Sequence, residues 1–113
     1  YGKTVYDADV ATAASITLAN TGSSNKLYKI NTIIAANIDG ANDADITVYV
    51  STAGSATGLF YLAKTITVPA DSTLVIISKD TSFYMEEDRS IRALASAAGD
   101  ISLMISYDEL DDA

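Results

Sequence analysis

The stretch "ISLMISYDE", residues 101–109, alternates apolar and polar side chains position by position. A period of two is the pattern of a β-strand with one buried face. The odd-numbered positions are expected to face a core: Ile101, Leu103, Ile105 and Tyr107. The even-numbered positions are expected to face outward: Ser102, Met104 and Ser106. This stretch therefore predicts a half-buried strand in a sheet that covers a core.

Similar short segments precede this strand, and clusters of Gly, Asp, Asn and Ser separate them. These segments are 15–20, 27–38, 45–51, 59–68, 72–78, 82–85 and 89–95. Strands at intervals of about 8–12 residues are typical of an all-β, antiparallel β-sandwich or a small barrel, and we favour the sandwich. We expect a jelly-roll or immunoglobulin-like sandwich of about seven to eight strands. The expected organisation is an N-terminal arm or edge segment at 1–14, a single sandwich domain at 15–110 and an acidic end at 111–113.

Alternation also predicts which side chains face the core in two of the earlier strands. In 27–38, six side chains are expected to share one face: Tyr28, Ile30, Thr32, Ile34, Ala36 and Ile38. In 45–51, three are expected to point inward: Ile46, Val48 and Val50. Thr47 and Tyr49 are then expected to point outward.

The composition excludes several kinds of chemistry. The 113 residues include no Cys and no His, so disulfides, thiolate sites and the usual general base near neutral pH are all missing. Fifteen acidic residues outnumber seven basic ones, for a formal charge of −8. Such a chain repels phosphate backbones and anionic lipid, so we expect neither nucleic acid nor a membrane as partner. We expect no enzymatic activity and no cofactor.

The loop "DGANDAD" places Asp39, Asp43 and Asp45 within seven residues. Oxygen-rich loops of this kind can bind calcium, which makes these three residues weak candidate metal ligands. Their spacing is not that of an EF-hand, and no Glu follows at the required distance. The favoured interpretation is a polar loop with a turn at Asp39-Gly40, in which Asp43 accepts hydrogen bonds from nearby backbone.

A second acidic group, Glu86-Glu87-Asp88, separates two apolar runs. Neighbouring side chains on extended backbone diverge, so three adjacent carboxylates do not converge on one point. We expect a turn between strands that contributes to solubility. A third group lies in "SYDELDDA", where Asp108, Glu109, Asp111 and Asp112 form an acidic tail that is either solvated or docked on a basic partner.

The chain has seven tyrosines, which is many for its length. Tyr is favoured at protein interfaces because its ring buries area while its hydroxyl remains paired. Four of them are candidate partner contacts: Tyr1, Tyr6, Tyr49 and Tyr61. The alternatives are a stacked sugar and ordinary strand composition.

The second half of the chain contains "ITVPADSTLVII" and "KDTSFYMEEDRSIRALASAAGDISLMISYDEL", and the first half contains "IIAANIDGANDADITVYV". This order resembles small β-sandwich virion proteins of tailed bacteriophages, including those of marine bacteria and cyanobacteria. The segments that carry the resemblance are Val68-Pro69-Ala70, Leu74 to Ile77, Lys79-Asp80, Tyr84 to Ile91 and Ser106-Tyr107-Asp108-Glu109. It covers most of 15–110, and the chain departs from the pattern at Ser82, where proline is common, and at Met85, where leucine is common.

The resemblance implies a non-enzymatic virion structural protein on the particle surface. Within that class we expect a capsid decoration or cement protein that contacts the major capsid protein or other virion proteins in many copies, with homo-oligomerisation. The N-terminal arm would add a strand to a neighbour. Three alternatives stay open: a neck, tail or baseplate protein; a subunit of an extracellular filament in which 1–14 complete the sheet of the next subunit; and a carbohydrate-binding or adhesin domain.

Overall fold

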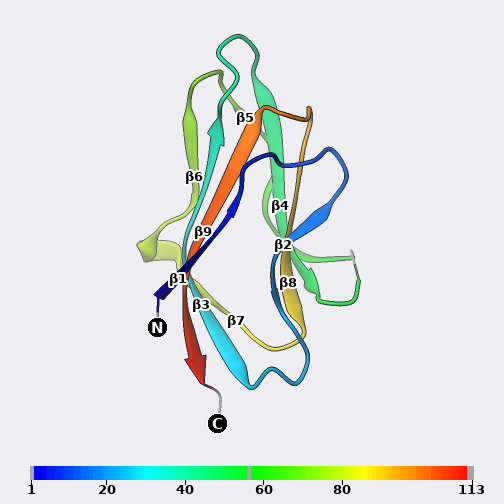
Figure 1. Ribbon diagram of the computed structural model, residues 1–113, viewed down its shortest axis with the longest axis vertical. Coiled ribbons are helices and arrows are strands. Elements are labelled where there is room, and N and C mark those ends of the chain that lie inside the picture. Colours follow the sequence, from blue (N-terminus) through cyan, green and yellow to red (C-terminus); the bar gives the residue numbers. More distant parts are fainter. Residues whose placement is uncertain (1, 56, 112–113) are drawn as a thin grey trace.

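The computed structural model describes residues 2–55 and 57–111, and within them the chain forms nine strands and one short 3₁₀ turn (Figure 1). The first five strands are β1 (Gly2–Asp7), β2 (Ser15–Asn20), β3 (Lys26–Asn37), β4 (Ala44–Thr52) and β5 (Gly58–Val68). The 3₁₀ turn at Lys79–Thr81 lies between β6 (Thr73–Ile77) and β7 (Phe83–Met85), and β8 (Arg89–Ala95) and β9 (Ile101–Asp111) follow. No helix in the described residues is long and apolar enough to span a membrane.

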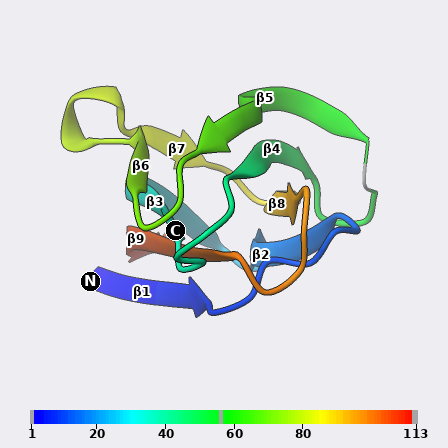
Figure 2. The same cartoon turned by 90° about the horizontal axis from the view of Figure 1, so that it is seen from above.

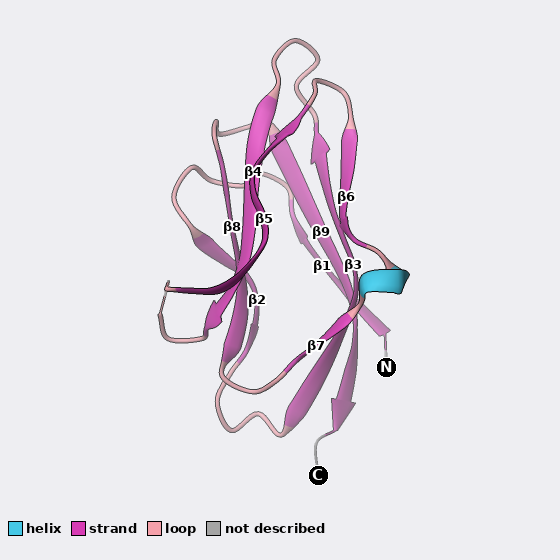
Figure 3. Ribbon diagram, turned by 180° about the vertical axis from the view of Figure 1, so that it is seen from behind, coloured by secondary structure: helices cyan, strands magenta, loops and turns pink. Residues whose placement is uncertain are grey.

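The strands form two antiparallel sheets that pack face to face, so the predicted β-sandwich is confirmed (Figure 3). Sheet A has the order β1-β9-β3-β6, with β7 also paired to β3, and sheet B has the order β2-β8-β4-β5. The chain therefore crosses repeatedly between the five-stranded sheet A and the four-stranded sheet B, and β1-β9-β3-β6 packed on β2-β8-β4-β5 is the strand order of a jelly roll. This topology decides between the two sandwich types that the sequence left open.

The expected number of strands, about seven to eight, is too low because the N-terminal residues also join the sheet. β1 pairs with β9 in register from Gly2 opposite Asp108 to Asp7 opposite Leu103. The connection to β2 is held to the sandwich as well: Val10 is fully buried, and its backbone N–H donates to the Ile101 carbonyl at 2.9 Å. The segment that was expected as an arm or edge segment thus contains an edge strand that pairs within its own chain.

The core lies between the sheets and consists mainly of β-branched side chains. The largest fully buried side chains come from both layers: Ile30, Ile33, Ile46, Met85, Ile91, Ile101, Leu103 and Ile105. Burial of one such side chain contributes about 1.5–3 kcal/mol. The alternation predicted for 101–109 is confirmed, because Ile101, Leu103, Ile105 and Tyr107 are all buried.

The face predicted for 27–38 is wrong beyond Ile30, because β3 contains a bulge. Ile30 pairs with Tyr107 and Thr32 pairs with Ser106, so Asn31 has no position opposite it on β9. One extra residue reverses the orientation of every side chain that follows. Ile33, Ala35 and Asn37 are consequently buried. Ile34, Ala36 and Ile38, expected inside, face outward.

Candidate interaction surfaces

β5 is the open edge of sheet B, and it carries an unusual density of exposed apolar side chains. It is 11 residues long and, within the described chain, forms its ladder with β4 alone. Four of its large apolar residues are exposed: Leu59 at 54%, Phe60 at 66%, Tyr61 at 46% and Ile66 at 41%. Natural edge strands are usually shortened or charged because their free backbone groups can pair with another chain. Here Lys64 is the one charged residue of the strand.

A groove of about 400 Å³ opens beside this edge, where β5 faces β6 and β7 of the other sheet. Its walls are side chains directed toward the sandwich interior: Val50, Phe60, Leu62, Ile77, Phe83 and Met85. Glu86 and Arg89 supply charge at its border. Phe60 is opposite Val50 in the register and yet is mostly exposed. The core is therefore incompletely covered on this side of the molecule.

β2 is the other edge of sheet B, and it has no charged residue at all. It pairs with β8, with a bulge between Ile16 and Leu18, and Ile16 is 45% exposed. Viewed from above, β1 and β2 lie along one side of the sandwich, and β5 and β6 lie along the opposite side (Figure 2). Sheet B is thus open at two opposite sides of the molecule.

The four candidate tyrosines have different environments. Tyr6 is 72% exposed on β1, and Tyr61 is 46% exposed on β5. Tyr49 points to the outer side of sheet B as predicted, but it is only 4% exposed because Tyr61 covers it, with 5.0 Å between the ring centroids. The expected exposure of Tyr49 is therefore wrong. Tyr1 lies outside the described residues.

The three aspartates of the 39–45 loop point to different partners. The Asp39 carboxylate accepts the backbone N–H groups of Ala41 and Asn42, at 2.8 and 3.3 Å, and these donors hold the pKa of Asp39 below its usual value. Asp43 accepts the Ala70 N–H at 3.0 Å, and Asp45 accepts the Thr67 hydroxyl at 2.7 Å. In the described residues, no three acidic, His or Cys side chains are placed to hold a metal ion.

The acidic triplet lies in the turn between β7 and β8. Asp88 has a left-handed backbone with φ of 60°, a conformation that Asp tolerates better than most residues. Its carbonyl accepts the Ala53 N–H at 3.2 Å, which ties this turn to the β4–β5 loop. Glu86 is the member of the triplet that reaches the groove.

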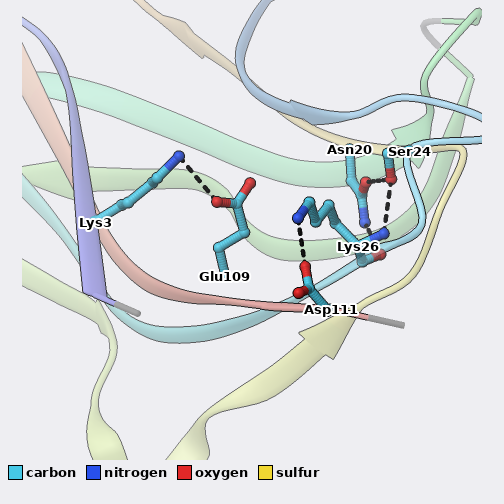
Figure 4. Close-up of polar contacts among 6 residues, drawn as sticks. All are labelled: Lys3, Asn20, Ser24, Lys26, Glu109 and Asp111. Atoms are coloured by element: carbon cyan, nitrogen blue, oxygen red, sulfur yellow. Dashed lines mark hydrogen bonds and ion pairs between the residues drawn. The ribbon is translucent and has the colours of Figure 1, made fainter. Parts of the chain in front are cut away.

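The acidic tail is largely part of β9 and is paired with lysines from two other strands (Figure 4). Lys3 of β1 forms an ion pair with Glu109 at 2.9 Å, and Lys26 of β3 pairs with Asp111. These lysines hold the pKa values of Glu109 and Asp111 below their usual range. Asp108 accepts a hydrogen bond from the Asn31 side chain at 3.1 Å, and Asp112 lies outside the described residues.

Phe60, Leu59 and the groove were not among the sites predicted from the sequence. One signal was present: Leu59-Phe60-Tyr61-Leu62 is a run of four large apolar residues, and a strand can direct only alternate ones inward. Such a run on an edge strand must leave some of them exposed.

No family model matches the chain, and no curated protein matches it. A solved structure of Bacillus endospore appendages, described as a novel family of disulfide-linked pili, is similar to it at 22% sequence identity. The alignment covers 95% of this chain and 86% of that one, with a TM-score of 0.46.

Proposed function

We propose that this protein is a non-catalytic structural subunit of an extracellular filament, in which β5 of one copy pairs with β2 of the next. The observation that carries the proposal is that both edges of sheet B are open and together contain a single charged residue, Lys64. Edge strands that lack charge and proline are suited to pairing with another sheet.

The strand directions favour a head-to-tail contact. Each neighbouring pair in sheet B is antiparallel, so β2 and β5 run in opposite directions. Copies related mainly by translation therefore place β5 antiparallel to β2 of the next copy. A heterologous contact of this kind does not close on itself at two subunits, and it produces rings or open filaments. The twist of the sheet turns such a row into a helix.

The groove supports the same contact. Pairing at β5 brings the β1–β2 side of the next copy to the side where the groove opens, and its apolar walls would then be covered. The proposed contacts consist of main-chain hydrogen bonds and apolar burial, and with no Cys in this sequence they include no disulfide.

A second placement for such a subunit is the surface of a phage particle, as a decoration protein or in the neck, tail or baseplate. The segments Val68-Pro69-Ala70 and Tyr84 to Ile91, on which the resemblance to phage virion proteins depends, favour it. There the same open edges would contact capsid or tail subunits. Cryo-EM of purified particles tests this placement, since the chain would occupy regular positions between capsomers or at one vertex.

The filament is tested by placing charge on each edge of the full chain. Phe60→Lys alters β5 and Ile16→Lys alters β2, and Ile38→Lys is the matched control because Ile38 is a 58% exposed residue outside the strands. We expect the wild type and Ile38→Lys to form filaments by electron microscopy, while each edge variant alone remains monomeric by analytical ultracentrifugation.

Mixing the two edge variants gives the sharpest result. Ile16→Lys keeps an intact β5, and Phe60→Lys keeps an intact β2, so an equimolar mixture should form a dimer that grows no further. Dimers of Ile16→Lys alone would show that β5 pairs with itself, which contradicts the head-to-tail arrangement. Filaments from Phe60→Lys would show that β5 is not the contact, and a wild type that never assembles would refute the filament itself.

A further inference from the structure

The outer face of sheet A has a continuous apolar row that crosses all four strands. Tyr6 pairs with Met104, Met104 with Ile34, and Ile34 with Val75. Directly opposed residues share a face, and this face points away from the core because the adjacent residues, such as Val5 and Leu74, pack inward. The row is exposed at both ends, with Tyr6 at 72% and Val75 at 55%.

The rows on either side of it are small and uncharged. One contains Thr4, Ser106 and Thr32, and the other contains Ser102, Ala36 and Thr73. Between β1 and β3, above Ser102 and Ala36, lies a hollow of about 430 Å³. Asp7 borders this hollow, where its carboxylate accepts the Asp9 backbone N–H at 3.2 Å. These three rows therefore form a face without charged side chains, hollowed on one side and bordered there by Asp7, on a chain with a formal charge of −8.

We propose that this face is a contact surface for a second copy of the chain, with the two sheets A packed against each other. Two highly acidic molecules repel each other over most of their surfaces, and this face is one where they can approach without opposing like charges. A two-fold axis parallel to the strands, between β9 and β3, places Tyr6 of one copy over Val75 of the other and Met104 over Ile34. The protruding Val75 then faces the side of the partner that holds the hollow.

The size of the face determines how strong this contact is. Three rows across four strands cover roughly 400 Å² at usual strand and residue spacings. Stable interfaces bury about 800 Å² per partner, so one pair of faces binds weakly. The contact becomes effective when many copies are already linked, because the contacts then act together. If the protein forms the proposed filaments, this contact between sheets A would join two filaments side by side. That role rests on the proposed function.

The test uses the absence of Cys, which makes any introduced thiol unique. One full-length variant has Tyr6→Cys and a second has Val75→Cys, both with Phe60→Lys to disable the β5 edge. A short bis-maleimide should cross-link the mixture of the two variants into dimers at a rate on the order of 10-fold higher than either variant alone. In the proposed dimer, the thiol at position 6 of one copy faces the thiol at position 75 of the other. Two thiols at the same position in the two copies are displaced from each other by about 14 Å across the strands, which is three strand spacings.

A charge at the centre of the face provides the control. Met104→Glu, added to both thiol variants, should abolish the difference between the mixture and the single variants. Leu94→Glu should not, because Leu94 lies on the outer side of a central strand of sheet B. Equal dimer yields from the mixture and the single variants, or dimers that survive Met104→Glu, would overturn the proposal. Since β5 is disabled throughout, this result is independent of whether edge pairing builds filaments.

Discussion

The Tyr61 ring lies directly over Gly58, so closely that a Cβ at position 58 would be 2.9 Å from Tyr61 Cε1. The same ring packs against Tyr49, and the Lys64 Nζ lies 5.2 Å from its centroid. Gly58 therefore allows Tyr61 to lie across β4 and β5 and to bury Tyr49. Gly58, Tyr61 and Tyr49 of the β4–β5 hairpin thus pack together beside the open edge.

Replacement of Gly58 by Ala should destabilise the fold, because the new methyl group forces the Tyr61 ring away from Tyr49. Overpacking in a rigid core costs about 1–3 kcal/mol, and the effect here should be near the lower end because the clashing atoms are the far end of a side chain that is 46% exposed. Urea unfolding measures the change in the free energy of unfolding. Gly54→Ala is the control, since a Cβ there meets no atom within 4 Å. Equal losses of stability for the two substitutions would mean that a clash with Tyr61 is not the cause of the effect at position 58.

Asn37 joins the end of β3 to the β3–β4 loop and to the last residue of β5 through a buried amide. Its Nδ2 donates to the Asn42 and Val68 carbonyls, each at 2.9 Å, and its Oδ1 accepts the Asp39 N–H at 2.9 Å. The side chain belongs to a residue that is 3% exposed, so Asn37→Ala leaves buried polar groups unpaired. This should cost about 1–3 kcal/mol in thermal or urea unfolding.

Asn42→Ala is the comparison for that measurement. Its side chain donates to Asp39 at an exposed site, at 3.2 Å, so its loss should change stability by less than about 0.5 kcal/mol. If Asn42→Ala were as damaging as Asn37→Ala, the Asp39 turn would be the important element and the buried amide would not.

The alternation of residues predicted the sandwich and the orientation of β9, because a strand without irregularities keeps a strict period of two. It could not predict the bulge at Asn31, which depends on pairing with β9, a strand about 70 positions away. That one extra residue turns Ile34 outward and Asn37 inward. The outer apolar row and the buried amide both depend on it. Tyr49 shows the same limit, since its burial depends on a ring from the next strand.

The ion pair between Lys3 of β1 and Glu109 of β9 should make the attachment of β1 sensitive to acid. The pKa of Glu109 is lowered chiefly by its hydrogen bond with Lys3, and that of Asp111 chiefly by Lys26. A carboxylate whose pKa is lowered by folding stabilises the fold at pH values above its pKa in the unfolded chain, which is near 4.5 for Glu and 3.8 for Asp. This contribution is lost as the pH falls through the folded-state pKa.

Hydrogen exchange of the β1 amides measures this loss. Protection of β1 should decrease below about pH 4 relative to that of β8, which has no such pair. In Lys3→Gln, β1 should already be less protected at pH 7 and should change less on acidification. Identical pH profiles for Lys3→Gln and the wild type would show that this pair does not hold the edge strand.

Asp100 should behave in the opposite way. Its pKa is raised, first by partial removal from water and then by the negative charge of Asp39. A carboxyl whose folded-state pKa exceeds the unfolded value opposes folding when it is ionised, so its cost is present at neutral pH and disappears as the pH falls below the unfolded value, near 3.8. Asp100→Asn removes the charge, and its amide can donate to Asp39 as only the protonated form of Asp100 can. The variant should therefore unfold at a higher urea concentration than the wild type at pH 7, and the two should unfold at the same urea concentration at pH 3.

An advantage that is equally large at pH 3 would contradict this explanation. The gain would then come from the shape or hydrogen bonding of the amide, and repulsion between Asp39 and Asp100 would not reduce the stability of the fold.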